Sequence, residues 1–145
     1  IRERHPEDDT IVLIHDAIRP MVNDDIITEN IRVCREYGNA ITVVPCTAAM
    51  LKTYDSLSTE EQVPRDNLKI TQTPQAFFLN DIIEAHKEAL SKGITNSVAS
   101  CTMYIELGKK LYMSKGSEKN LKLTTSEDIE IFKALLNSKK DEWMH

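Results

Sequence analysis

One stretch restricts the fold of this chain more than any other: Ile11-Val12-Leu13-Ile14-His15-Asp16-Ala17-Ile18-Arg19-Pro20. Four consecutive aliphatic residues without polar alternation predict a strand covered on both faces, as in a parallel sheet with helices on each side. The chain turns polar directly after this run. Because ligands of open α/β sheets bind outside the carboxyl ends of the strands, His15, Asp16 and Arg19 are expected at the ligand crevice, and Asp16 and Arg19 are candidate site residues.

Asp16 and Arg19 carry side chains that suit phosphate chemistry. A carboxylate can hold a hard cation such as Mg²⁺, and a guanidinium can form two parallel hydrogen bonds with a phosphate. A second interpretation is that both residues only brace a turn, which Pro20 prevents from becoming a helix. The stretch alone leaves both interpretations open.

The next residues continue an alternation of strand and helix. Asn23 is a suitable N-cap, and apolar residues then recur at helical spacing until Gly38. Residues 40–44 predict a second apolar strand, which Pro45 closes. Strand, helix and strand at this spacing fit a right-handed crossover, so we predict an α/β fold with a mainly parallel sheet.

The remainder of the chain predicts an arm and further short elements. Residues 48–54 and 67–72 are interpreted as the two strands of a ribbon. Because such a ribbon is marginal alone in water, it must lie on the domain or on a second subunit, and we favour dimerisation through residues 46–73. Helices are expected over residues 80–92 and from Thr125, which forms a capping box with Asp128. The other expectations are strands over 103–107, 111–114 and 120–124, the end of a helix at 1–5 and a frayed tail over 137–145.

Composition excludes several classes of function. The 145 residues suffice for one domain with a sizeable core. A net charge of -5 argues against non-specific binding of nucleic acid or of an anionic membrane, and no apolar run approaches the length of a membrane span. The three cysteines are widely spaced and odd in number, which argues against zinc and against a disulfide framework. We interpret them as reduced thiols of a cytoplasmic protein.

Three later residues are further site candidates, each with a structural alternative. Lys122 lies between Leu121 and Leu123, so its side chain could point to the ligand-binding edge, although an exposed lysine on an edge strand is commoner. Arg65 follows Pro64 on the ribbon, where arginines are usually solvated. Thr73 belongs to Gln72-Thr73-Pro74-Gln75, which could be only a rigid turn before a helix.

Three motifs in a fixed order carry a family resemblance: His15-Asp16-Ala17-Ile18-Arg19-Pro20, then Arg65 with Gln72-Thr73-Pro74-Gln75-Ala76-Phe77, then Asn120-Leu121-Lys122-Leu123-Thr124-Thr125 with Asp128. Together they resemble the cytidylyltransferases that act on sugar-alcohol phosphates. This family includes the 2-C-methyl-D-erythritol 4-phosphate and ribitol-5-phosphate cytidylyltransferases, whose products serve isoprenoid biosynthesis and CDP-polyol synthesis. The resemblance extends from about residue 10 to about residue 136.

The resemblance implies a Rossmann-like α/β domain, a homodimer joined through the protruding ribbon, and Mg²⁺-dependent transfer of CMP from CTP. Asp16 resembles the family aspartate near the metal and substrate, and Arg19 its neighbouring arginine. Arg65 resembles the ribbon arginine that reaches the sugar phosphate in the partner subunit's site. Thr73 resembles a threonine that lines the site, and Lys122 the catalytic lysine that contacts the reacting phosphates.

Three departures from the family pattern set further expectations. The glycine-rich CTP-binding loop of the family lies upstream of the aspartate motif, so we expect residues 1–145 to be the C-terminal part of a single nucleotidyltransferase domain, without the N-terminal part of the fold and inactive alone. Ala48-Ala49 and Asn96-Ser97 replace polar or acidic family residues near the acceptor, which suggests a different polyol phosphate or a weakened enzyme.

Two alternatives to an enzyme of this type remain. The chain could be a non-catalytic dimerisation or interaction module that keeps the sheet and ribbon. A weaker hypothesis uses Cys46 or Cys101 as a thiol nucleophile, although neither has an obvious adjacent base.

Overall fold

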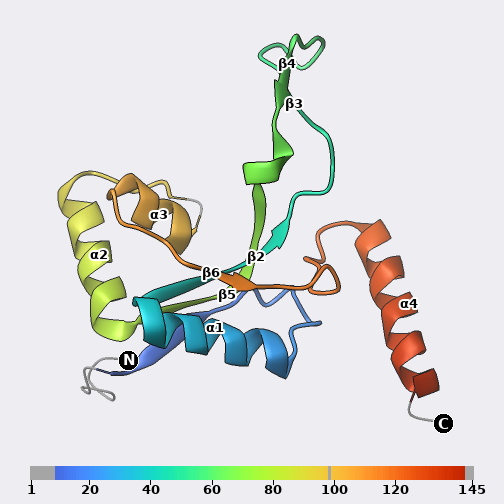
Figure 1. Ribbon diagram of the computed structural model, residues 1–145, viewed down its shortest axis with the longest axis horizontal. Helices are drawn as coiled ribbons and strands as arrows, with labels where there is room; N and C mark the ends of the chain where they lie inside the picture. Colours follow the sequence, from blue (N-terminus) through green and yellow to red (C-terminus); the bar gives the residue numbers. More distant parts are fainter. Residues whose placement is uncertain (1–8, 98, 143–145) are drawn as a thin grey trace.

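A four-stranded sheet organises the computed structural model, which describes residues 9–97 and 99–142 (Figure 1). In chain order the elements are β1 (Ile11–Ile14), α1 (Asp24–Tyr37), β2 (Asn39–Pro45), β3 (Met50–Lys52), β4 (Glu61–Val63), the 3₁₀ turn η1 (Arg65–Asn67), β5 (Lys69–Phe78), α2 (Leu79–Ser91), α3 (Ser100–Glu106), β6 (Met113–Lys115) and α4 (Ser126–Glu142).

The sheet has the strand order β1-β5-β2-β6. Strands β1 and β2 both pair with β5 in antiparallel register, and β6 pairs with β2 in parallel. The α/β class is therefore confirmed. Strands β1, β2 and β6 share one direction, but β5 runs between β1 and β2 in the opposite direction. The sheet is therefore mixed instead of mainly parallel, because both pairings of β5 are antiparallel.

Helices cover both faces of this sheet. Helix α1 packs on one face, where Val33 and Cys34 contact Ala40 and Ala76. Helices α2 and α3 pack on the other face, around Phe77. Because successive side chains of a strand point to opposite faces, neighbouring residues of β2 and β5 supply both cores.

The capping signals of α1 are confirmed. The Asn23 side chain accepts a hydrogen bond from the Ile26 amide at 3.0 Å, and Asp24 and Asp25 occupy the first turn. Gly38 ends the helix with φ 98°, a left-handed conformation that glycine adopts without a steric penalty, and its amide donates to Cys34. These caps fix where the chain enters β2.

The expectation that β1 is covered on both faces holds only for its first half, where Ile11 and Val12 pack against the two opposite cores. This strand lies at the edge of the sheet, and Leu13 and Ile14 remain 36% and 39% exposed. An aliphatic run predicts a strand but does not by itself reveal whether the strand has one neighbour or two.

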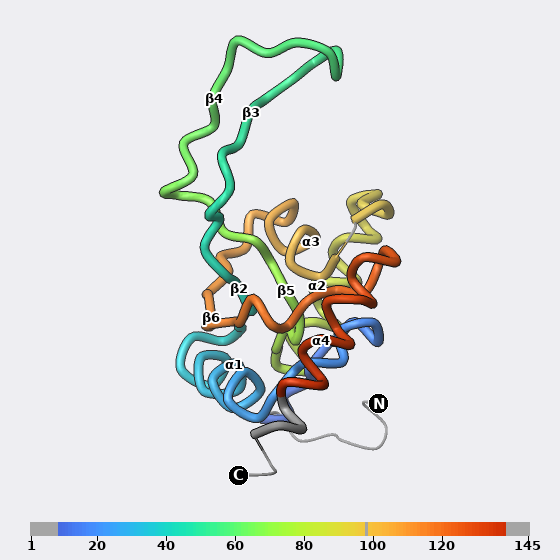
Figure 2. The backbone as a smooth tube through the Cα atoms, turned by 90° about the vertical axis from the view of Figure 1, so that its right-hand side faces the viewer, coloured from blue at the N-terminus to red at the C-terminus, as the bar shows by residue number. Residues whose placement is uncertain are grey.

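An arm projects from the sheet between β2 and β5 (Figure 2). Its strands are β3 and β4, with Met50 opposite Val63. The arm was therefore correctly predicted, but one of its strands was not. Residues 67–72 are wrong as a ribbon strand, because most of them belong to β5 and pair with β2 in the main sheet. Their alternating pattern marks a strand without identifying its partner.

Several other element predictions are corrected. Residues 103–107 lie mainly in helix α3 instead of a strand, because Met103 and Tyr104 pack together in the core beside α2. Residues 120–124 form no strand and belong to the loop before α4. Residues 137–142 continue α4 instead of fraying. Residues 1–5 and 143–145 lie outside the described part of the chain.

The capping box at the start of α4 is confirmed. The Thr125 amide donates to the Asp128 carboxylate at 2.8 Å, and the Asp128 amide donates to the Thr125 hydroxyl at 3.2 Å. Figure 1 shows α4 standing apart from the other helices. Within the residues that the structure describes, no helix is long and apolar enough to cross a lipid bilayer.

Candidate active site

Three separate segments of the chain meet at one place. Asp16 and Arg19 follow β1, Thr73 lies within β5, and Lys122 lies in the loop between β6 and α4. Hydrogen bonds and ion pairs connect these four residues to one another. The convergence expected from the sequence is therefore present, and we call these residues the Asp16 cluster.

Asp16 forms the centre of the cluster. Its Oδ2 atom lies 3.1 Å from Nε of Arg19 and 3.4 Å from Nζ of Lys122. Its backbone amide donates to Oγ1 of Thr73 at 2.9 Å. Two cations around one carboxylate leave a net positive charge, so this is a local basic site on an acidic protein.

The charges of the cluster differ in their access to solvent. The side chain of Arg19 is 10% exposed, whereas that of Lys122 is 46% exposed. Burial raises the pKa of Asp16, but hydrogen bonds from Arg19 and Lys122 outweigh this effect and hold the pKa below its ordinary value. Asp16 is thus ionised at neutral pH, Arg19 is fixed, and Lys122 can turn its ammonium group toward an anionic ligand.

His15 holds Thr73 in a defined orientation. Its Nε2 atom lies 3.2 Å from the Arg19 carbonyl, which can only accept, so Nε2 carries the proton in the neutral ring. Nδ1 then accepts from the Thr73 hydroxyl at 3.0 Å. Since Thr73 also accepts from the Asp16 amide, its hydroxyl is positioned from both sides.

A cavity of about 350 Å³ opens beside the cluster. Its walls include Asp16, Thr73, Gln75 and His86, together with Ser97. This volume is within the range of small-molecule sites. The cavity is therefore a candidate site for a small polar ligand that reaches Asp16.

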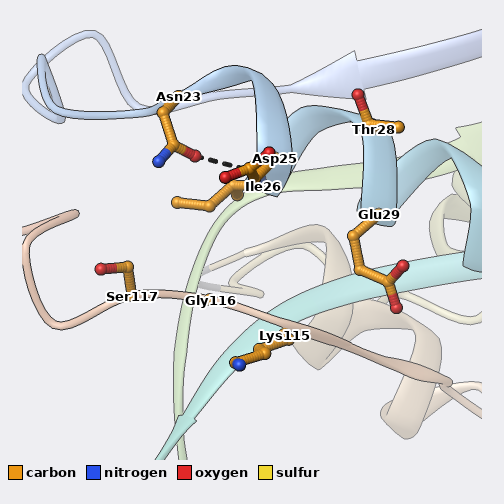
Figure 3. A pocket seen from close by; sticks show the side chains of 8 residues that line it. All are labelled: Asn23, Asp25, Ile26, Thr28, Glu29, Lys115, Gly116 and Ser117. Atoms are coloured by element: carbon orange, nitrogen blue, oxygen red, sulfur yellow. Dashed lines mark hydrogen bonds between the residues drawn. The ribbon is translucent and has the colours of Figure 1, made fainter.

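A separate hollow of about 580 Å³ lies at the first turns of α1 (Figure 3). Its walls combine Asn23, Asp25 and Glu29 with the segment from Lys115 to Ser117, and they include no member of the Asp16 cluster. Asp16 and Thr73, which were expected from the sequence, therefore mark the cavity of about 350 Å³ as the candidate site.

The cluster fits a divalent cation in one specific way. Within residues 9–97 and 99–142, no group of three His, Cys, Asp or Glu side chains gathers as a metal site. Mg²⁺ commonly takes one or two protein carboxylates and completes its shell with water and substrate phosphates. Asp16, which is 32% exposed, could supply such a carboxylate.

Comparison with known proteins identifies the family to which the chain belongs. The family model described as "2-C-methyl-D-erythritol 4-phosphate cytidylyltransferase" (IspD) matches residues 4–138. The chain belongs to the IspD family. The resemblance drawn from the three motifs is thereby confirmed.

Individual relatives of this IspD-family chain have two kinds of name. The ribitol-5-phosphate cytidylyltransferase of Streptococcus agalactiae serotype III (strain NEM316) is 36% identical over 143 residues, which are 99% of this chain and 60% of the relative. The 2-C-methyl-D-erythritol 4-phosphate cytidylyltransferase of Clostridium acetobutylicum is 39% identical over 128 residues, which are 87% of this chain and 55% of the relative. The chain thus spans about 60% of the length of such relatives.

Solved structures agree with this assignment. The crystal structure of 2-C-methyl-D-erythritol 4-phosphate cytidylyltransferase from Thermus thermophilus matches with a TM-score of 0.78 and 27% identity. The match covers 86% of this chain and 61% of the Thermus chain. The mixed sheet with its helices therefore matches part of the fold of this family.

In this IspD-family chain, Arg65 lies apart from the cluster. It begins η1 at the base of the arm, and its Nη1 atom donates to the Thr47 carbonyl at 2.6 Å. Together with Lys69 it lines a hollow of about 320 Å³. Arg65 therefore does not join the Asp16 cluster of its own chain, and its expected role in a partner's site stays a prediction.

The thiol hypothesis receives no support from the surroundings of the cysteines. All three cysteines are free and buried, as expected of reduced thiols. The thiol of Cys46 faces the Ala48 carbonyl, and that of Cys101 accepts from Gln75. Neither contact supplies a histidine that could activate the thiol.

Sequence reasoning did not single out one polar residue that organises the site. Asn120 was noted only as part of the third motif, whereas His15 was expected at the ligand-binding end of the strand. One available signal for Asn120 was a short polar side chain directly before the Leu-Lys-Leu run, where a buried amide can hold a loop.

Proposed function

We propose that this chain forms part of the active site of an enzyme that transfers CMP from CTP to a sugar-alcohol phosphate and releases pyrophosphate. The observation that carries the proposal is the Asp16 cluster, which gathers two cations beside a cavity of about 350 Å³ in a chain of the IspD family. Relatives named for ribitol 5-phosphate and for 2-C-methyl-D-erythritol 4-phosphate support the substrate class.

The proposed reaction needs no side-chain nucleophile. An oxygen of the acceptor phosphate attacks the α-phosphorus of CTP and forms a new phosphorus–oxygen bond. The bond from the α-phosphorus to the oxygen that bridges it to the β-phosphorus breaks, and pyrophosphate leaves with that oxygen and the bonding electron pair. Negative charge then spreads over oxygens in the transition state, where fixed cations stabilise it more than they stabilise the ground state.

The residues of the cluster divide this work. Lys122 has a half-exposed ammonium group, so it can move from Asp16 to a reacting phosphate. Arg19 is buried and held in place, so it offers a preorganised guanidinium to a phosphate oxygen. Thr73, fixed by His15 and by the Asp16 amide, lines the cavity beside them.

The proposed cofactor is Mg²⁺. Asp16 would hold it together with phosphates of the substrates, and the bound ion would neutralise charge on those phosphates.

One wall of the cavity is proposed to contact the acceptor. Ser97 lies on its wall, in the segment that departs from the family pattern at Asn96-Ser97. The Ser97 hydroxyl donates to the Glu106 carboxylate at 2.9 Å and can still accept a hydrogen bond from a polyol hydroxyl. Both ribitol 5-phosphate and 2-C-methyl-D-erythritol 4-phosphate belong to the proposed class.

The arm is proposed to join two subunits of a cytoplasmic homodimer. Three apolar side chains of the arm are strongly exposed: Leu51 at 62%, Tyr54 at 79% and Leu57 at 91%. A two-stranded ribbon is only marginally stable in water unless another surface, here a second subunit, covers its apolar side chains. Arg65 and the Ala48-Ala49 segment would then approach the partner's site, and the unpaired thiols suit a reducing compartment.

Product formation tests the proposal. The complete gene product that contains these 145 residues would be incubated with CTP, Mg²⁺ and either ribitol 5-phosphate or 2-C-methyl-D-erythritol 4-phosphate. We expect pyrophosphate release matched by a CDP-linked polyol of the correct mass. Absence of such a product with these and related polyol phosphates would refute the activity. An arm-dependent dimer that binds no CTP would then favour the non-catalytic interaction module.

A further inference from the structure

Asn120 connects the parts of the Asp16 cluster from inside the protein. Its side chain is fully buried. The Nδ2 atom donates to the Thr73 carbonyl at 2.9 Å and to Oε1 of Gln72 at 3.3 Å. Both hydrogens of the amide group are therefore directed at β5, beside the threonine that lines the cavity.

The backbone of Asn120 reaches a second part of the cluster. Its carbonyl accepts from Nη1 of Arg19 at 2.7 Å, while Nε of the same guanidinium contacts Asp16. A guanidinium held at two of its nitrogens has little freedom to rotate. The position of residue 120 therefore helps to set the direction of Arg19.

The loop that carries Lys122 is attached on both sides of that lysine. Two residues before Lys122, Asn120 attaches the loop to β5. One residue after Lys122, the Leu123 amide donates to the Ile18 carbonyl at 2.9 Å. Lys122 itself has a half-exposed, flexible side chain. The position of its ammonium group is consequently set by the anchored backbone on either side of Lys122, and not by packing of the aliphatic part of its side chain.

Gln72 extends this attachment to the beginning of the loop. Its Nε2 atom donates to the Ser117 carbonyl at 2.9 Å. The loop passes so close that a Cβ atom on Gly116 would lie 2.5 Å from Oε1 of Gln72. The same Cβ would also lie 2.9 Å from Cγ2 of Thr42, so a larger residue at position 116 would require the loop or its neighbours to shift. Gln72 and Asn120 together dock the loop on β5.

The two ends of the Asn120 amide differ in their hydrogen bonding. Its Oδ1 atom is buried and has no hydrogen-bond partner among the described residues. Such an unpaired acceptor is unfavourable, and an apolar side chain would avoid it. The benefit of asparagine here therefore lies in its two donated hydrogen bonds.

We propose that Asn120 is a positioning residue for the transfer reaction: it holds Lys122, Arg19 and Thr73 in one arrangement without touching the substrate. This inference rests on the proposed function of the Asp16 cluster. Small displacements of aligned groups reduce rates strongly, by about 100-fold for about 1 Å.

A double-mutant cycle separates positioning from a general loss of structure. Asn120→Ser would be made in the wild-type and in the Lys122→Ala background of the complete gene product. We expect kcat to fall by about 10- to 100-fold in the first background. Because Lys122 is then already absent, only the misplacement of Arg19 and Thr73 can still lower kcat, so we expect a clearly smaller fall in the second background than in the first.

Asn30 provides the matched control. It is equally buried, has an unpartnered Oδ1, and donates from Nδ2 to Thr42 and Ser114 rather than to cluster residues. Asn30→Ser should lower stability to a similar extent but leave kcat within about 3-fold. Equal losses from Asn120→Ser in both backgrounds, or a loss no larger than that of Asn30→Ser, would overturn the proposal.

A second measurement does not depend on turnover. In hydrogen exchange, Asn120→Ser should accelerate the amides of Asn120 and Leu123 while those within α1 stay unchanged. Unaltered exchange at both amides would overturn the positioning role. If the wild-type protein transfers CMP to no acceptor, the proposed function fails, and the exchange result alone decides whether Asn120 holds the loop.

Discussion

Replacing Lys122 by methionine separates catalysis from stability at the Asp16 cluster. The substitution removes one positive charge and keeps an unbranched side chain of similar length. Nζ of Lys122 lies 3.4 Å from Asp16, and the side chain is 46% exposed. Ion pairs of this exposed kind contribute about 0–1 kcal/mol, so we expect the free energy of unfolding to change by less than about 1 kcal/mol.

The effect on turnover should be much larger. If Nζ contacts charge that develops on the reacting phosphates, its loss removes one fixed electrostatic contact in the transition state. Such contacts are typically worth about 3–4 kcal/mol, or about 100- to 1,000-fold in kcat. The structure thus leads us to expect a severe loss of turnover in a protein of nearly unchanged stability.

Two assays on the same preparations test this expectation. Formation of the CDP-linked product gives kcat, and urea unfolding gives stability. Lys119→Met is the control, because Lys119 is exposed in the same loop and its amide bonds only within that loop, to Ser117. Full turnover by Lys122→Met would remove Lys122 from the mechanism. A loss of stability that accounts for the lost activity would assign Lys122 a structural role.

Three further outcomes are expected. The pKa of Asp16 in the folded protein lies below its ordinary value of 3.8, so the unfolded chain binds the proton more readily than the folded chain. The stability that Asp16 contributes is therefore present above about pH 4, and it is lost as the pH falls through the folded-state pKa. Urea unfolding of Asp16→Asn should therefore depend less on pH in acid than the wild type, and an identical pH profile would contradict this. Asn23→Ala removes the cap that accepts from the Ile26 amide, and should lower the free energy of unfolding by about 1 kcal/mol in the same assay; an unchanged midpoint would show that the cap contributes little. Leu57→Asp places a charge at the most exposed apolar position of the arm and should convert a dimer to a monomer in sedimentation experiments, whereas Glu60→Gln should not; equal masses for both variants would exclude Leu57 from the interface.

Local signals in the sequence predicted those parts of the fold that depend on neighbouring residues. Asn23 and Gly38 marked the ends of α1, and Thr125 with Asp128 marked the start of α4. Each signal works through hydrogen bonds within a few residues, so it can be seen without knowledge of the tertiary structure.

Partners of strands could not be predicted in the same way. The aliphatic run of β1 did not reveal that β5 would be its one neighbour, and residues 67–72 did not reveal that β2 would pair with them. Met103 belongs to a short apolar run that fits a strand or a buried helix equally well. Long-range packing decides such cases.

The candidate site shows the same division. Asp16 and Arg19 were predicted because they directly follow a strand, at the ligand-binding edge of the sheet. Thr73 and Lys122 were assigned to the site mainly because their motifs resemble those of the family. Asn120 was missed because its role depends on hydrogen-bond acceptors in β5, which are distant from it in the sequence.

A crystal structure with CTP and the acceptor phosphate bound would test the central claim most directly. We predict that phosphate oxygens lie within hydrogen-bond distance, about 3 Å, of Arg19 and Lys122. The sugar-alcohol should extend into the cavity lined by Thr73 and Ser97. Phosphate groups bound elsewhere, with Lys122 still paired to Asp16, would contradict the proposed role of the cluster.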